Sequence, residues 1–255
     1  IMDGKSEFEI MSAYSTGEEE CLISAEILLR DNIERKRHSI LVGPPGTGKT
    51  RLVKLLLDEL KDSGSLAVFE IIQFHPQYSY QDFIEGYTVN AGVFDYKEGV
   101  FKKFIANCDE TKLNVFIIDE VNRADISSVF GELLNLLDYE DGKEVKLPSS
   151  GDYISVKKNT IVICTMNSAD KNIAIMDFAL RRRFSFIFVP PDYSGLSEWL
   201  NKIGFDVEGL TVSEYVQAIA GLNQRIILHP LLGKNMTLGQ SFFVPESGLA
   251  DLKSI

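Results

Sequence analysis

Apolar and polar residues alternate along the chain in two ways, and each way predicts a different kind of element. Short, nearly continuous apolar runs are typical of strands buried on both faces of a sheet, and they occur at Ser39–Val42, Leu66–Phe74, Asn114–Glu120, Thr160–Asn167 and Phe184–Pro190. Apolar residues at helical spacing predict helices at Thr50–Leu60, Val100–Cys108 and Ser127–Asp138. Strands that alternate with helices predict an α/β fold with a five-stranded parallel sheet.

Other stretches of the chain follow different patterns. Tyr87–Gly99 and Lys143–Asn159 alternate around turn residues, which predicts two β-hairpins. After Pro190 the pattern becomes mostly helical, at Leu196–Gly204 and Val212–Ile227. We therefore expect a large α/β domain over residues 1–190 and a smaller α-helical lid over 191–255. Because the chain begins Ile-Met, we expect it to be part of a longer protein, and the lid could be incomplete.

A glycine-rich turn follows the first predicted strand. It reads GPPGTGKT and fits the pattern G-x-x-x-x-G-K-[ST] of a phosphate-binding loop. Glycines let the backbone turn tightly and direct its N–H groups inward, while the next helix adds positive potential at its N-terminus. Lys49 can reach the β- and γ-phosphates, and the Thr50 hydroxyl can ligate Mg²⁺. The predicted nucleoside triphosphate site comprises Gly43, Pro44, Pro45, Gly46, Thr47, Gly48, Lys49, Thr50 and Arg51.

Composition narrows the function classes. The 255 residues are 45% apolar, enough for a full core, and the net charge of −11 argues against a broad basic face that grips DNA. The three cysteines lack C-x-x-C spacing and the three histidines form no metal pattern, so we expect reduced thiols and a cytoplasmic protein. No apolar run reaches membrane length, which predicts that the chain has no membrane partner.

Two acids end the third predicted strand. In "FIIDE", Asp119 can hold Mg²⁺ together with Thr50, and Glu120 can orient or deprotonate an attacking water. Ligand sites in such sheets lie beyond the carboxyl ends of the strands, where these acids would lie. The alternative is that the two acids only cap the end of the strand and have no catalytic role. A second acid is unnecessary for holding Mg²⁺, so the pair favours hydrolysis over binding alone.

Polar residues after the next two strands complete the candidate site. Asn167 ends the fourth strand and could touch the γ-phosphate or the water; the alternative is a turn-forming asparagine. Arg181, Arg182 and Arg183 lie between a helix and a strand. They could form a solvated turn, or one of them could reach a γ-phosphate in the same or a neighbouring chain and neutralise charge in the transition state.

Together these motifs resemble the AAA+ family, and within it the McrB-type GTPases of modification-dependent restriction systems. GPPGTGKT and FIIDE are generic AAA+ elements, whereas "MNSADKNIAIMDFALRRRFSF" is similar to the more specific McrB-type signature. Gln73–Tyr87 and Ile117–Asp138 are similar to McrB-type sequence as well. The likeness spans nearly the whole chain.

The resemblance implies an AAA+ P-loop NTPase with a helical lid, and a homo-oligomeric ring, a hexamer, with nucleotide between subunits. It implies GTP hydrolysis that drives DNA translocation and cleavage by a McrC-like endonuclease subunit, which also stimulates the GTPase. It also implies that a separate N-terminal domain, which we expect to lie outside this chain, recognises the modified DNA.

Carried over by residue, the resemblance gives Lys49, Glu120, Asn167, Arg182 and Arg183 as catalytic, with Thr50 and Asp119 as Mg²⁺ ligands. It also places Asp170 in the nucleotide site and suggests that Asn122 and Arg123 relay contacts between subunits. The chain departs from the McrB-type pattern at Ser168 and Lys171, where the signature has Thr and Arg, and at Gln240, where such lids often have His.

Two further functions stay open. The chain lacks the Asn-Lys-x-Asp motif with which many GTPases read guanine, so ATP is the alternative nucleotide and a MoxR-like protein-remodelling ATPase the alternative function. A nucleotide-switched assembly module with little turnover is a third possibility. The presence of Glu120, Asn167 and the arginines disfavours it.

Overall fold

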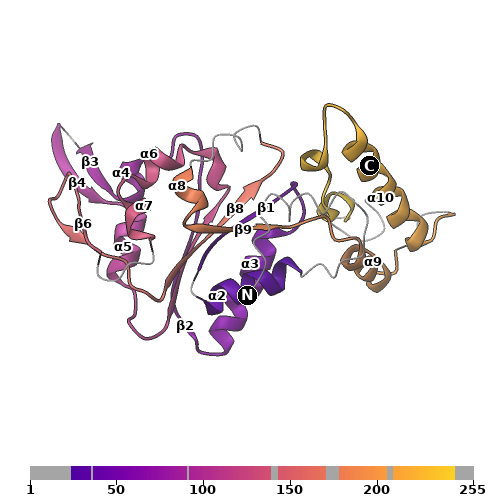
Figure 1. Cartoon of the computed structure of the whole chain (residues 1–255), viewed down its shortest axis with the longest axis horizontal. Coiled ribbons are helices and arrows are strands. Elements are labelled where there is room, and N and C mark those ends of the chain that lie inside the picture. The colour runs from indigo at the N-terminus through magenta and orange to yellow at the C-terminus, as the bar shows by residue number, and fades with distance from the viewer. Residues whose placement is uncertain are drawn as a thin grey trace, which may run out of the picture.

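The computed structural model describes residues 24–35, 37–90, 92–138, 143–170, 178–205 and 209–244. A five-stranded parallel sheet in the order β2-β5-β8-β1-β9 forms its centre (Figure 1). The strands are β1 (His38–Gly43), β2 (Leu66–Gln73), β5 (Leu113–Asp119), β8 (Thr160–Asn167) and β9 (Phe184–Phe188). The predicted α/β class and the five parallel strands are confirmed.

Helices bury both faces of this sheet. In β5, Val115 and Ile117 face a cluster that includes α2 and α3, whereas Phe116 and Ile118 face a cluster built with α4 to α7. Both faces are apolar, which explains why the strands read as continuous apolar runs. The helices are α2 (Ala25–Glu34), α3 (Lys49–Asp62), α4 (Tyr80–Phe83), α5 (Val100–Ala106), α6 (Ile126–Phe130) and α7 (Leu133–Leu136).

The single helix predicted over Ser127–Asp138 is wrong, because the segment forms two short helices, α6 and α7. Gly131 separates them with a φ of 48°, a conformation that ends an α-helix. A Cβ at Gly131 would lie 2.9 Å from the ring of Tyr80, so the glycine also makes room for α4. Helical periodicity alone did not reveal this break.

Both predicted hairpins are confirmed. One joins β3 (Glu85–Asn90) to β4 (Val93–Glu98), and the other joins β6 (Val145–Lys146) to β7 (Tyr153–Ile154), each antiparallel. Figure 1 places the β3–β4 hairpin at the opposite end of the molecule from α9 and α10.

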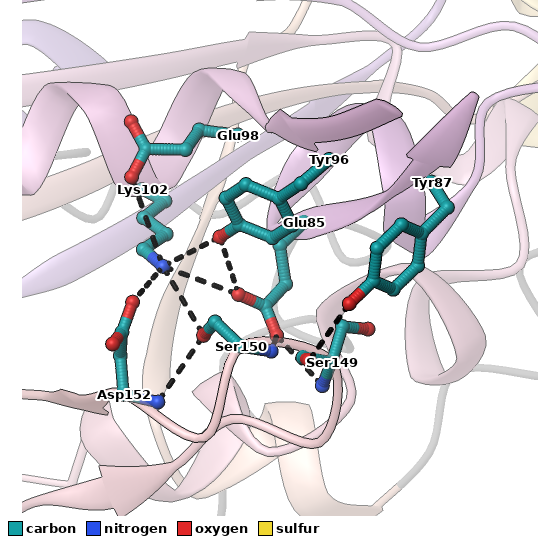
Figure 2. A network of polar contacts seen from close by, with 8 residues as sticks. All are labelled: Glu85, Tyr87, Tyr96, Glu98, Lys102, Ser149, Ser150 and Asp152. Carbon is teal, nitrogen blue, oxygen red and sulfur yellow. Dashed lines mark hydrogen bonds and ion pairs between the residues drawn. The ribbon is translucent and has the colours of Figure 1, made fainter. Parts of the chain in front are cut away.

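A buried polar network ties the two hairpins together (Figure 2). The carboxylate of Glu85 accepts hydrogen bonds from the backbone N–H groups of Ser149 and Ser150, each at 2.9 Å, and from the Tyr96 hydroxyl at 2.7 Å. Lys102 donates to Glu85 at 3.1 Å and to Asp152 at 2.7 Å. Burial alone would raise the pKa of Glu85, but the hydrogen bonds outweigh it and lower the pKa to about 2.

We expect Glu85→Ala to lower the free energy of unfolding by about 3 kcal/mol, because it leaves two N–H groups without their acceptor and removes the buried carboxylate that pairs with Lys102. Glu98→Ala is the matched control. Glu98 lies 3.7 Å from the same Lys102 amine but is 45% exposed, so its removal should cost at most about 0.5 kcal/mol. Urea denaturation of both variants measures the difference, and equal losses would show that the network does not stabilise the hairpins.

Acid should weaken the same network. The folded pKa of Glu85 lies below its ordinary value of 4.5, so its contribution is complete above pH 4.5 and is lost as the pH falls toward 2. The stability difference between wild type and Glu85→Ala should therefore shrink over that interval. A difference that stayed constant down to pH 2 would contradict this assignment.

The elements after β9 are helical, as expected, and pack around a cluster of their own. Leu196, Leu200, Phe205 and Ile219 form its buried centre. The elements are α9 (Tyr193–Lys202), α10 (Val212–Leu228), η3 (Lys234–Met236) and η4 (Gln240–Phe243). No helix in the described part of the chain has the length and apolar character needed to span a membrane.

Candidate active site

The glycine-rich loop joins the C-terminal end of β1 to the N-terminus of α3. Gly46 and Gly48 adopt φ values of 79° and 84°, which glycine reaches without the steric cost that other residues pay. Gly48 is the N-cap of the 14-residue α3, and no side chain caps this N-terminus. The free N–H groups and the helix dipole together favour an anion here.

Lys49 is buried at the centre of the loop. Its Nζ donates to the carbonyls of Gly43 and Pro44, at 2.9 and 2.8 Å, and to Oδ1 of Asn167 at 2.9 Å. Burial lowers the pKa of Lys49. The nearby carboxylates of Asp119, Glu120 and Asp170 oppose this effect but are weaker, so the pKa is about 8. The ammonium is thus held at the strand ends by groups that a phosphate could replace.

Thr50 and Asp119 lie side by side at the same edge of the sheet. The Thr50 hydroxyl donates to Oδ1 of Asp119 at 2.9 Å, and the Thr165 hydroxyl of β8 donates to the same oxygen. Mg²⁺ prefers such oxygen ligands in an octahedron, in which adjacent oxygens lie about 3 Å apart. The two predicted ligands therefore fit Mg²⁺ in chemistry and spacing.

Glu120 has an unusual backbone and a crowded carboxylate. Its φ of 55° makes it the one non-glycine residue with positive φ among the described residues, and its N–H donates to the Thr165 hydroxyl at 3.1 Å. Its carboxylate accepts from Gln73 at 3.0 Å and Asn167 at 3.3 Å, and pairs with Arg123 at 2.6 Å. Such strained conformations concentrate at functional sites.

Asn167 thus connects the loop to the acid pair, because its Oδ1 contacts Lys49 and its Nδ2 contacts Glu120. Asp170 lies close by: the Asn122 amide donates to its carboxylate at 3.3 Å and to the Asn167 carbonyl at 3.4 Å. The structure therefore brings Lys49, Thr50, Asp119, Glu120, Asn167 and Asp170 together. Lys171 lies outside the described residues.

The three arginines differ in how far they are buried. Arg181 and Arg182 are exposed, whereas Arg183 is buried and pairs with Asp138 through Nε at 2.7 Å and Nη2 at 3.0 Å. Its Nη2 also contacts the Asn135 side chain of α7 at 3.4 Å. Arg183, which directly precedes β9, therefore has a structural partner just after α7 that its sequence context did not indicate.

We expect Arg183→Ala to lower the free energy of unfolding by about 2 kcal/mol, because it leaves the partly buried Asp138 carboxylate without its guanidinium. Arg182→Ala, one residue away and exposed, should change stability by less than about 0.5 kcal/mol. Thermal and urea unfolding of the two variants distinguish these effects. Equal stability of both variants would mean that the Arg183–Asp138 pair contributes nothing to the fold.

Two site residues were missed by reasoning from sequence. Gln73 ends β2, and its proximity to Glu120 follows only once β2 is known to pair with β5. Thr165 is a polar residue inside the apolar run of β8, and that irregularity was a usable signal. Both contact the acid pair directly.

The chain matches known proteins in sequence. The model of the AAA domain (dynein-related subfamily) matches residues 38–184. The Escherichia coli (strain K12) "Type IV methyl-directed restriction enzyme EcoKMcrB subunit" is 36% identical over 217 residues, 82% of this chain and 47% of the relative. The Bacillus subtilis (strain 168) "Type II restriction enzyme BsuMI component YdiS" is 25% identical over 60% of this chain and 57% of the relative.

One solved structure, a putative ATPase from Cytophaga hutchinsonii, is similar with a TM-score of 0.46 and 20% identity; the match covers 81% of this chain and 63% of that protein. The chain spans about half the length of the curated relatives it matches. The resemblance drawn from the motifs is confirmed by the sequence matches.

Proposed function

Because the chain belongs to the family of AAA domains of the dynein-related subfamily, we propose that it is a McrB-type motor that hydrolyses GTP in a homo-oligomeric ring. The family match itself supports a nucleoside triphosphatase domain. The observation that supports hydrolysis is the pair of contacts of Asn167, to Lys49 on one side and Glu120 on the other.

The roles within the site follow from these contacts. The loop N–H groups and Lys49 bind the β- and γ-phosphates, with Asn167 releasing Lys49 Nζ as phosphate replaces it. Glu120 accepts a proton from, or orients, the attacking water, and the Asn167 amide holds the Glu120 carboxylate toward that position. Gln73 fixes the same carboxylate from the neighbouring strand.

Thr50 and Asp119 would hold Mg²⁺. When bound, the ion would neutralise charge on the phosphate oxygens. The Thr165 hydroxyl bonds both to the Asp119 carboxylate and to the Glu120 N–H, so it keeps the two acids in fixed relative positions.

Arg182 is the better candidate for an arginine that acts on a neighbouring subunit. It is exposed, whereas Arg183 is committed to Asp138 in the same chain. A cation that reaches across a subunit boundary can neutralise charge that develops on the transferred phosphoryl group. We assign residues 191–255 the role of the lid over the nucleotide.

The restriction role rests on sequence similarity. The two relatives are restriction-system components by name, so we propose that this chain drives DNA translocation and cleavage by a McrC-like endonuclease subunit. The net charge of −11 fits DNA recognition by a separate domain. The missing guanine motif favours the alternative, a MoxR-like ATPase that remodels proteins.

Nucleotide affinity should fall at alkaline pH. A phosphate-binding lysine must be protonated, and the pKa of Lys49 in the free chain is about 8. Above that pH the affinity for triphosphate should decrease by up to about tenfold per pH unit, because binding must first take up a proton. Lys49→Arg is the control, since arginine stays charged. Wild-type affinity that is unchanged up to pH 9.5 would refute the role of Lys49.

Phosphate release at several protein concentrations tests the proposed function. We expect faster release from GTP than from ATP, and activity that rises more steeply than protein concentration because each site needs a neighbouring subunit. Faster release from ATP would favour the remodelling ATPase. Activity strictly proportional to the concentration of a monomer, confirmed by sedimentation, would overturn the ring.

A further inference from the structure

A short segment after α10 binds the outer side of the glycine-rich loop. Three successive residues of this segment, Gly239 to Ser241, donate to three successive loop carbonyls. The Gly239 N–H contacts Pro45 O at 3.0 Å and the Ser241 N–H contacts Gly46 O at 3.0 Å. The Gln240 side chain completes the set, because its Nε2 donates to Thr47 O at 2.9 Å.

Two glycines make this approach possible. A Cβ on Gly239 would lie 2.1 Å from the carbonyl carbon of Gly46, and a Cβ on Gly46 would lie 2.5 Å from the Ser241 hydroxyl. Neither position has space for a side chain. Gly46 is therefore needed both for the turn of the loop and for its contact with this segment.

The carbonyl contacts determine where the loop N–H groups point. In a planar trans peptide, the C=O of one residue and the N–H of the next point in opposite directions. When the carbonyls of Pro45, Gly46 and Thr47 are held toward the segment, the N–H groups of Gly46, Thr47 and Gly48 are held away from it. These N–H groups belong to the turn that is predicted to surround the phosphates.

Gln240 is held from both ends of its amide. While Nε2 donates to the loop, Oε1 accepts from the backbone N–H of Asp192 at 3.1 Å. Asp192 is the N-cap of α9, and its side chain accepts from the N–H of Gly195. The Gln240 amide therefore bridges the loop and the start of α9.

A buried asparagine fixes the residue just before the segment. Asn223 of α10 is 1% exposed, and its amide brackets Leu238: Nδ2 donates to the Leu238 carbonyl at 2.9 Å, and Oδ1 accepts from the Leu238 N–H at 2.8 Å. Nδ2 also contacts the Tyr193 hydroxyl at 2.8 Å. All of its bonds are to elements outside the nucleotide cluster.

We propose that Gln240 and Asn223 are positioning residues for phosphate binding. Asn223 sets the path of the segment, and Gln240 with its neighbours pulls three loop carbonyls outward, so that the opposite N–H groups converge on the anion. This assignment rests on the proposed nucleotide function and adds to it a specific origin for the shape of the loop. It also makes the affinity for phosphate depend on the positions of α9 and α10 relative to the loop.

Inorganic tripolyphosphate with Mg²⁺ is the direct probe, because it carries the phosphates without base or ribose. Gln240→Glu keeps an acceptor for Asp192 but loses the donor to Thr47, so we expect about tenfold weaker binding of both tripolyphosphate and GTP. Asn223→Leu should weaken both ligands to a similar degree. Lys202→Ala, an exposed position in the last turn of α9, should bind both ligands within twofold of wild type.

Calorimetric titration of the full chain, with the melting temperature measured alongside, separates the outcomes. Wild-type tripolyphosphate affinity in Gln240→Glu, or a loss confined to GTP, would overturn the positioning role. If Asn223→Leu does not fold, Gln240→Glu alone still decides. Lys49→Ala is run in parallel: unaltered GTP binding in that variant would instead refute the nucleotide function itself.

Discussion

Replacing Glu120 with glutamine is expected to slow hydrolysis of bound triphosphate by at least about a hundredfold while leaving its binding within twofold. Glutamine has nearly the same shape, and its single amide oxygen can still accept from Gln73, which contacts one of the two carboxylate oxygens at 3.0 Å. It cannot take a proton from water. The variant should therefore keep its fold and its nucleotide and lose the chemical step.

Single-turnover phosphate release measures the chemical step, and equilibrium titration measures binding. Glu110→Gln removes a carboxylate whose side chain is 82% exposed, so it should hydrolyse nucleotide at the wild-type rate. Unchanged turnover in Glu120→Gln would show that another group activates the water. A parallel loss of binding would point to a structural role for the carboxylate.

Replacing Lys49 with alanine is expected to weaken triphosphate binding by about a hundredfold or more, since charge-assisted contacts to phosphate are among the strongest hydrogen bonds. Its Nζ already lies among loop carbonyls at 2.8–2.9 Å, with the strand ends on its other side.

Lys61→Ala is the matched control, because Lys61 lies in the last turn of the same helix, where its exposed amine contacts Asp58 and the ring of Phe69. Its removal should leave affinity unchanged. Comparable affinity losses in both variants would indicate general damage to α3. Wild-type affinity in Lys49→Ala would mean that the loop does not bind the triphosphate as proposed.

Most of the sheet was predictable from the sequence because its strands are buried on both faces. β8 was predicted at Thr160–Asn167 and has those bounds, since each of its side chains before Asn167 is buried. The break at Gly131 was missed because helical periodicity continues across it, and the reason for the glycine, the ring of Tyr80, comes from a distant segment.

The candidate site was predictable where its functional side chains come at the ends of strands. The acids at the end of β5 and Asn167 at the end of β8 meet because parallel neighbours end at one edge of the sheet. Gln73 depended on strand order, and Arg183 depended on a partner, Asp138, that is 45 residues away. Such pairings are set by tertiary packing, which no local pattern contains.

Titration of the purified chain with GTP and with ATP, in the presence of Mg²⁺, tests the central claim most directly. A McrB-type motor should bind GTP clearly more tightly than ATP, and Lys49→Ala should bind both about a hundredfold more weakly than wild type. Preference for ATP would contradict the McrB-type function while leaving the fold and the phosphate site in place.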